Sequence, residues 1–392
     1  MRNLLGSILL LLPLWLLAGE EPESKIRFES STWSAVLSKA KAEKKLIFVD
    51  AYASWCGPCK KMAREVFTND TAGDFYNTNM INVKMDMEVG EGLELAKKYH
   101  VKAYPTFLFV NGDGVLVHRS VGARPVRDFV DMGANAMSPD HQISTLNQRY
   151  ASGEREFAFM KKYLLALLDA DEPYDSVYRQ YIVTQRDAQL GSEDNRRIIF
   201  HCEHQPLTRE HRFMEANLEG FEKRYGEAYV KHIVEENYQE ALAAIIQSSP
   251  KQYQHFRDTF MMLNVEAASA AAISTDVDYY LQMKDWIAYR KSAELYLSRH
   301  DDANSYNSVA YSCYEKCKDR TTLQWALDLA EKSVSMSENE ANLDTYACLL
   351  YATGNKKQAI ITEEKALNLA LQSGHSAYIN EFRKNLKKFR GK

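Results

Sequence analysis

The chain has 392 residues, of which 45% are hydrophobic and 26% are charged, a composition typical of globular protein. Its net charge of −4 offers no broad basic surface, so nucleic acid is not an expected partner. Six cysteines are too few for a small disulfide scaffold, and the length favours two or three domains.

The first 19 residues have the pattern of a signal peptide. Arg2 precedes the apolar run LLGSILLLLPLWLLA, and the small residues Ala18 and Gly19 suit cleavage. This run is shorter than the roughly 20 residues that a bilayer requires. We therefore expect an exported, periplasmic protein, with an anchor formed by an uncleaved N-terminal segment as the alternative. Export would place a cysteine pair in an oxidising compartment.

The first part of the chain, at residues 25–138, is rich in turn-forming residues. Residues 1–140 contain 10 Gly and 6 Pro, whereas residues 141–392 contain 7 and 3. The apolar patterns predict strands and helices in the order β-α-β-α-β-α-β-β-α, over residues 25–29, 31–45, 45–52, 56–67, 81–87, 92–100, 106–110, 115–121 and 125–137. This order predicts an α/β domain with a mixed central sheet and helices on both faces.

The rest of the chain is predicted to be an all-α domain that follows a linker at residues 137–142. Residues 156–170 and 322–336 carry apolar residues at helical spacing. Residues 301–378 resemble tetratricopeptide helix pairs, because bulky, small and turn residues recur where such pairs need them, at Leu343, Ala347, Gly354, Ala359 and Ala366. A generic stack of α-hairpins is the alternative. Residues 141–300 are expected to form a helical array without a clear period.

Two cysteines, Cys56 and Cys59, flank Gly57 and Pro58, and three interpretations are open for them. A zinc site would need a second ligand pair, and the first domain has no further cysteine. A structural disulfide would close a very short loop and contribute little stability. A redox pair is favoured because a helix is expected to start here. Its N-terminal N–H groups would stabilise a Cys56 thiolate, which is the nucleophilic form.

The neighbouring residues suit the same chemistry. Pro58 has a backbone angle suited to the first turn of a helix and lacks an N–H group that would remain unpaired there. Gly57 leaves room for a partner chain, and Trp55 provides an apolar rim.

The segment FVDAYASWCGPCK resembles the active-site segment of the thioredoxin family, and AYPTFLFVNGDG resembles its partner loop and hairpin. The resemblance implies that Cys56 attacks a disulfide, that Cys59 resolves the intermediate and that Asp50 is the buried acid. It also implies that the peptide bond before Pro105 is cis. Lys84 resembles the lysine that neighbours the acid in many relatives, although a solvated lysine is equally compatible with the sequence.

The resemblance further implies a groove that binds the client backbone, formed by Trp55, Gly57, Pro58, Tyr104 and Pro105. Relatives usually carry a small or β-branched residue before the proline, so Tyr104 is a departure that bears on client specificity. Gly and Pro between the cysteines resemble the reducing members of the family. No metal and no cofactor are expected beyond the Cys56–Cys59 disulfide.

The resulting hypothesis is a thiol–disulfide oxidoreductase that reduces disulfides in protein clients and receives electrons from a membrane donor. The helical domain would bind a client or partner or mediate self-association. One alternative is a binding protein whose helical repeats are the working part, and a second is a disulfide isomerase. The sequence HCEH at residues 201–204 could suggest a metal cluster but is interpreted as an ordinary helix segment. Cys313 and Cys317, four positions apart, could bind a soft metal or oxidise, but small buried residues in a helix pair are favoured, and Cys348 fits the same interpretation.

Overall fold

The computed structural model describes residues 24–391, so the expected signal peptide at residues 1–19 lies outside the described residues. The chain divides into two compact units, Met1–Cys202 and Glu203–Lys392. The first contains the whole β-sheet, and the described part of the second is helical. The expected domain boundaries near 138 and 300 stay predictions, and the two units are described separately below.

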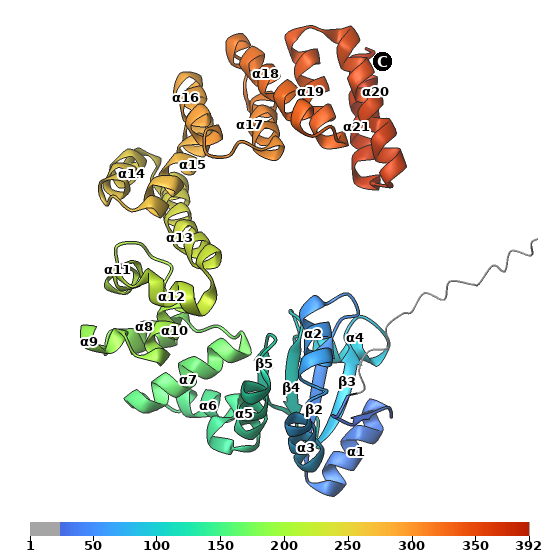
Figure 1. Ribbon diagram of the computed structural model, residues 1–392, viewed down its shortest axis with the longest axis vertical. Coiled ribbons are helices and arrows are strands. Elements are labelled where there is room, and N and C mark those ends of the chain that lie inside the picture. Colours follow the sequence, from blue (N-terminus) through green and yellow to red (C-terminus); the bar gives the residue numbers. More distant parts are fainter. Residues whose placement is uncertain (1–23, 392) are drawn as a thin grey trace, which may run out of the picture. The chain divides into compact units, whose positions relative to one another are not determined.

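A five-stranded mixed sheet forms the centre of the first unit (Figure 1). Its order is β1-β3-β2-β4-β5, with β1, β3 and β2 parallel and with β4 and β5 antiparallel to their neighbours. The strands are β1 Phe28–Glu29, β2 Leu46–Tyr52, β3 Met80–Asp86, β4 Thr106–Val110 and β5 Leu116–Val121. β2 is therefore central, which explains why its sequence is apolar on both faces.

Helices cover both faces of this sheet, as the sequence predicts. One face carries α2 Gly57–Glu65, α3 Asp70–Asn79 and α5 Val126–Met137 over a core centred on Phe48. The other face carries α1 Trp33–Glu43 and α4 Glu91–Lys98 over a core that includes Val49. Because side chains alternate along a strand, Phe48 and Asp50 both point to the α2 face.

Two details of the first domain differ from the expectation. Helix α3 was not predicted, because Gly73 interrupts its apolar pattern; this glycine is required there, since a Cβ would approach the Lys25 carbonyl oxygen to 2.9 Å. Asn69 caps this helix with its side chain and is the signal that could have revealed it. Pro125 occupies the N-cap of α5 instead of its first turn.

A helical extension completes the first unit. It comprises α6 Ile143–Ala151, α7 Phe157–Ala170, α8 Asp175–Ile182, α9 Asp187–Leu190 and α10 Glu193–Cys202. Helices α6 and α7 pack against β5 at the edge of the sheet (Figure 1). The Ile143 N–H donates to His118 Nδ1 (3.3 Å), and the Ser120 hydroxyl donates to the Asp169 carbonyl oxygen (3.2 Å). The expected linker forms a single 3₁₀ turn, Pro139–His141.

The second unit is built from helices that pack on their chain neighbours. They are α11 Arg209–Ala216, α12 Leu218–Tyr225, α13 Glu227–Ser248, α14 Tyr253–Met262, α15 Glu266–Met283, α16 Trp286–Leu297, α17 Ala303–Lys316, α18 Arg320–Met336, α19 Glu340–Thr353, α20 Lys356–Ser373 and α21 Ser376–Phe389. From α17 to α21 each helix packs against the next, as expected for tetratricopeptide-like pairs.

The residues that suggested this repeat lie where such a pair needs them. Leu343 and Ala347 are buried on α19, and Ala359 and Ala366 are fully buried on α20. Gly354 ends α19 with φ 102°, a left-handed conformation that glycine adopts without a steric penalty. Small residues at the contact allow the two helices to approach closely.

A polar cluster lies between the last three helices. The Asn385 amide of α21 donates to Asp344 Oδ1 of α19 (2.8 Å), and Glu363 of α20 is fully buried. Burial and the Asp344 carboxyl raise the pKa of Glu363 to about 10, and burial also raises the pKa of Asp344. Glu363 therefore carries its proton at neutral pH, because burial and the neighbouring carboxyl both disfavour its charged form.

Candidate active site

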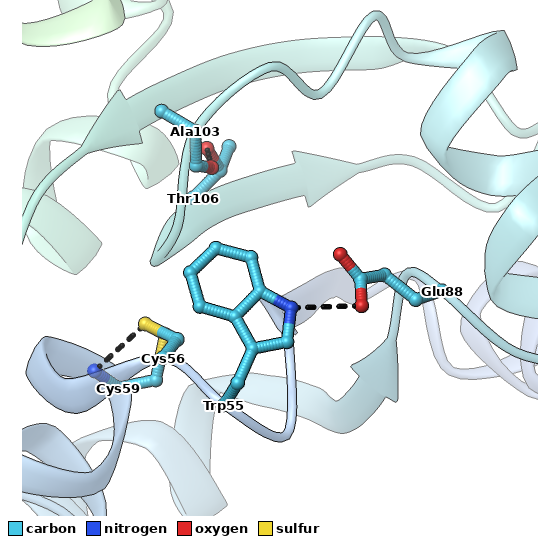
Figure 2. Close-up of a disulfide and its surroundings, with 6 residues drawn as sticks. All are labelled: Trp55, Cys56, Cys59, Glu88, Ala103 and Thr106. Atoms are coloured by element: carbon cyan, nitrogen blue, oxygen red, sulfur yellow. Dashed lines mark hydrogen bonds between the residues drawn. A yellow bond between two sulfur atoms is a disulfide. The ribbon is translucent and has the colours of Figure 1, made fainter. Parts of the chain in front are cut away.

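The cysteine pair lies at the start of α2, immediately after β2. Cys56 is the N-cap residue and α2 begins at Gly57, with Pro58 in the first turn. The two sulfurs form a disulfide of 2.02 Å, and the Cys59 N–H donates to Cys56 Sγ at 3.1 Å (Figure 2). Cys56 Sγ therefore occupies the position at which a helix N-terminus stabilises negative charge.

Asp50 is buried in the sheet on the face that α2 covers. Its side chain follows Phe48 on that face, and its residue is only 1% exposed. Burial raises the pKa of Asp50 to about 7, while the positive charge of Lys84 acts in the opposite direction. Oδ1 of Asp50 has no hydrogen-bond partner within the described part of the chain. A carboxyl group in this state can accept or release a proton near neutral pH.

The loop before β4 approaches the cysteine pair from the other side. The Tyr104–Pro105 peptide bond is cis, as the family resemblance implied. The Thr106 hydroxyl donates to the Ala103 carbonyl oxygen (2.7 Å), and the Gly122 N–H donates to the Pro105 carbonyl oxygen (2.9 Å). Tyr104 packs against the cluster formed by Ala53 and the two cysteines. The structure thus brings together residues that are about 50 positions apart in the sequence.

An aromatic pair borders the disulfide. The Trp55 and Tyr104 rings make an edge contact at 5.9 Å between centroids, although Trp55 itself is 66% exposed. Figure 2 shows the Trp55 indole beside the disulfide, with its ring N–H donating to Glu88 Oε2 at 2.9 Å. Cys56 is only 2% exposed in this arrangement. A disulfide-bearing partner therefore needs some movement of this border to reach Sγ.

The remaining groove residues line an open edge. Gly57 and Pro58 are exposed, and a Cβ added at Gly57 would meet nothing within 4 Å. The surface at Gly57 is therefore open. Trp55, Gly57 and Pro58 adjoin the cysteines in the chain, Tyr104 packs against them, and Pro105 follows Tyr104 across the cis peptide bond.

Sequence reasoning missed Glu88, which holds the Trp55 indole. Glu88 follows β3, and its N–H donates to the Asp86 carboxylate (3.0 Å) in the turn that returns toward Trp55. An acidic residue in an exposed loop carries no local signal for this contact. Only the adjacency of β2 and β3 in the sheet brings the two loops together.

Other candidate ligands do not converge on a second site. In residues 24–391 no group of three or more His, Cys, Asp or Glu side chains is placed to hold a metal ion. The sequence HCEH does not form one helix segment, because α10 ends at Cys202 before Glu203 and His204. Cys313 and Cys317 are buried in one apolar cluster, and Cys348 is buried on α19. Burial raises the pKa of all three thiols, which makes them poor nucleophiles.

None of the helices formed by residues 24–391 combines the length and the apolarity that crossing a bilayer requires.

Comparisons with known proteins match the domain that carries the cysteine pair. The thioredoxin family model matches residues 25–133. The chain is 36% identical over 107 residues to thioredoxin H4 of Arabidopsis thaliana, covering 27% of this chain and 85% of that protein. It is 41% identical over 92 residues to an H-type thioredoxin of Oryza sativa subsp. indica, covering 24% and 70%. A solved structure from Bacteroides thetaiotaomicron, described as a proposed disulphide-isomerase, is 42% identical over 29% of this chain and 95% of that chain, with a TM-score of 0.28.

Proposed function

The chain belongs to the thioredoxin family, and from this premise we propose that it is an exported reductase of disulfides in protein clients. The observation that carries the proposal is the position of Cys56 at the N-cap of α2, with the resolving Cys59 one turn into the helix. The helix N-terminus favours the Cys56 thiolate, which is the form that attacks disulfides.

The first step forms a mixed disulfide. In the reduced enzyme the Cys56 thiolate attacks one sulfur of the client disulfide, and a Cys56–client bond replaces the client S–S bond. The second client sulfur leaves as a thiolate. Tyr104 and Pro105 would hold the client backbone, and the open space beside Gly57 would admit it.

The second step releases the client. Asp50 accepts the thiol proton of Cys59, directly or through water, and the Cys59 thiolate attacks Cys56 Sγ. The Cys56–Cys59 disulfide forms, and the client leaves with both sulfurs reduced. The client has gained two electrons and the enzyme pair has lost two. The raised pKa of Asp50 supports this role, because a carboxyl group with a pKa near 7 exchanges protons at physiological pH.

Three further parts of the proposal concern the surroundings of this domain. The apolar N-terminal segment supports export to the periplasm, with an anchored form as the alternative. An exported reductase needs an electron donor, which we assign to a membrane protein that presents a dithiol. The helical repeats would bind the client or a partner, or mediate self-association, because stacked helix pairs present extended surfaces.

The decisive experiment measures insulin reduction with dithiothreitol as electron source. We expect the purified protein to accelerate it and the Cys56→Ser variant to have no activity above background. Failure of the unaltered protein to accelerate the reaction would favour the alternative in which the helical repeats are the working part.

Two companion measurements test the finer points. The Cys59→Ser variant keeps the attacking sulfur but cannot resolve the intermediate, so it should accumulate mixed disulfides with its clients, which mass spectrometry would identify. Recovery of activity from scrambled ribonuclease at a rate exceeding net reduction would favour the isomerase alternative. N-terminal sequencing of protein from a periplasmic fraction would show whether the signal is cleaved near Gly19.

A further inference from the structure

The turn between α7 and α8 lies against the loop that precedes the cis proline. A cavity of about 250 Å³ is lined by this turn on one side, with Asp171, Glu172 and Pro173. The loop at residues 100–105, called the client loop below, and strand β5 line the other side, with Lys102, Ala103 and Arg119 among others. Within the first compact unit the helical extension therefore borders the loop that carries Tyr104 and Pro105, although none of the five groove residues lines the cavity itself.

Arg119 of β5 connects the two sides. Its side chain is 8% exposed, and its guanidinium makes an ion pair with Glu172 Oε1 at 3.0 Å. The other terminal nitrogen donates to the His100 carbonyl oxygen at 3.2 Å. His100 begins the loop that ends at Pro105 and has a left-handed φ of 51°. A single buried side chain thus connects the extension to the base of the client loop.

The loop is also held by contacts within the thioredoxin domain, among them the Val101 N–H, which donates to the Ala96 carbonyl oxygen (2.9 Å). The Thr106 hydroxyl donates a hydrogen bond to the Ala103 carbonyl oxygen, and the Gly122 N–H donates one to the Pro105 carbonyl oxygen. Among the contacts of this loop in residues 24–391, the hydrogen bond from Arg119 to the His100 carbonyl is the one that depends on a residue beyond position 138, Glu172. The orientation of Tyr104 between these contacts therefore depends partly on whether Arg119 stays in place.

The negative charge of Glu172 holds the Arg119 guanidinium in position. Among the described residues, Glu172 is the only carboxylate within ion-pair distance of this guanidinium. The nearby Asp169 is already paired with Arg197 at 2.6 Å and lies 4.0 Å from Arg124. The Arg119 side chain is buried, whereas that of Glu172 is 36% exposed, so removing the carboxylate leaves a buried positive charge uncompensated, which favours its movement toward water. Such a movement would release the His100 carbonyl.

We propose that Glu172 is a positioning residue for the client-binding loop, acting through Arg119. The helical extension is then part of the working oxidoreductase and sets how tightly protein clients are held. This inference rests on the proposed function, because that function makes the 100–105 loop a client-binding element.

The test uses Glu172→Gln in the full chain, which removes the charge and keeps the size. We expect the KM for insulin to rise about three- to tenfold with kcat within about twofold, since the loop contributes to client binding more than to the chemical step. Reduction of a small disulfide such as 5,5′-dithiobis(2-nitrobenzoic acid) should stay within about twofold, because it needs little of the groove.

Matched variants separate this role from a general loss of charge. Glu154→Gln also removes a carboxylate paired with an arginine of the extension, Arg149 at 2.6 Å, but this pair makes no contact with the client loop in the described part of the chain, so the KM should not change. Glu172→Asp should restore most of the affinity. In an Arg119→Gln background, Glu172→Gln should have no further effect, since both changes act on one connection.

Hydrogen–deuterium exchange of residues 100–106 gives a readout that does not require activity. We expect exchange in this loop to accelerate about tenfold in Glu172→Gln and to stay unchanged in β2, a pattern of local opening. If the unaltered protein reduced no insulin, the proposed function would fail while this measurement still decided whether Glu172 holds the loop. An unchanged loop would overturn the inference, and so would a faster loop with an unchanged KM. The inference would also be overturned if Glu172→Gln lost both its activity on the small disulfide and its cooperative thermal unfolding, because Glu172 would then be a structural residue only.

Discussion

Asp50 of β2 and Lys84 of β3 are register partners across the parallel part of the sheet, yet only the carboxyl group is buried. Lys84 is exposed, and its ammonium lies 4.9 Å from the centre of the Tyr52 ring. The lysine charge offsets part of the effect of burial, but burial dominates and the pKa of Asp50 rises to about 7. The carboxyl group therefore changes protonation state in the physiological range.

The first prediction concerns the role of Asp50 in turnover. Asp50→Asn should lower the rate of the resolving step at pH 8 by about tenfold or more, because general-base assistance is removed. In the unaltered protein this rate should rise with pH through about 7, and the variant should lack that rise. Stopped-flow measurement of mixed-disulfide decay between pH 5 and 9 tests this. Identical pH profiles would exclude Asp50 as the base.

The same residue should lower the stability of the fold. Its pKa is about 7 in the folded protein and ordinarily 3.8, so the folded state retains a proton that the unfolded state releases between these values. The contribution of Asp50 to stability is then greatest below pH 3.8 and falls until about pH 7, by roughly 4 kcal/mol at most. Asp50→Asn should therefore raise the free energy of unfolding at pH 8 and have little effect near pH 4. Native-state hydrogen exchange of β2 amides measures this difference, and a destabilised variant at pH 8 would contradict the prediction.

Tyr104 should limit access to Cys56. It packs beside the cysteines and contacts Trp55, and Cys56 is 2% exposed. Tyr104→Val should expose the sulfur and accelerate alkylation of reduced Cys56 by iodoacetamide about two- to tenfold, since thiol reactions depend on access. Tyr104→Phe keeps the ring and is the control, with little expected change. Equal alkylation rates in all three proteins would show that Tyr104 does not cover the site.

His118 should make the first unit sensitive to acid. Burial lowers the pKa of His118 to about 4, below its ordinary 6.5, and its Nδ1 accepts the Ile143 N–H of the extension. Between pH 6.5 and 4 His118 is therefore protonated in the unfolded state but not in the folded state. The free energy of unfolding decreases as pH falls through this window.

His118→Gln keeps a hydrogen-bond acceptor and should reduce this loss by roughly 2–3 kcal/mol. Hydrogen exchange of β5 amides at pH 7 and pH 4.5 gives the measurement. His255→Gln, at an exposed position on α14, removes a histidine without affecting this contact and should leave the loss unchanged. An unaltered pH dependence in His118→Gln would refute the assignment.

The buried carboxyl groups of Asp344 and Glu363 should make the C-terminal helices less stable as pH rises. The pKa of Glu363 is raised to about 10, above its ordinary 4.5, so the stability of α19–α21 falls as pH rises between these values. Glu363→Gln removes that cost and supplies a donor toward Asp344. We expect a gain of roughly 1–3 kcal/mol at pH 8, allowing for relaxation of the pair.

Glu364→Gln is the matched control, because Glu364 is the exposed neighbour that pairs with Arg390. Its removal should change stability by less than about 0.5 kcal/mol. Hydrogen exchange of α20 amides measures both variants. A loss of stability in Glu363→Gln would mean that the carboxyl group makes a favourable contact that an amide cannot replace.

Much of the fold could be predicted from local patterns. The apolar run at 45–52 correctly predicted a buried strand, and the Cys56–Lys60 segment correctly predicted a helix start. Both predictions depend only on neighbouring residues. The pair at α19 and α20 followed from small residues and Gly354 at fixed spacing. Helix α3 was missed because Gly73 serves a contact with Lys25, which is distant in sequence.

By itself, the sequence determined the cysteine pair at a helix start, because helix capping depends on neighbouring residues, whereas the roles of Asp50 and Pro105 followed from the resemblance to the thioredoxin family. The tertiary structure decided what surrounds them. The burial that shifts the pKa of Asp50, the approach of Tyr104 to Cys56 and the Glu172–Arg119–His100 connection all join segments far apart in the chain. Such contacts depend on strand order and on the packing of α7 at the β5 edge, and no local pattern of residues encodes that arrangement.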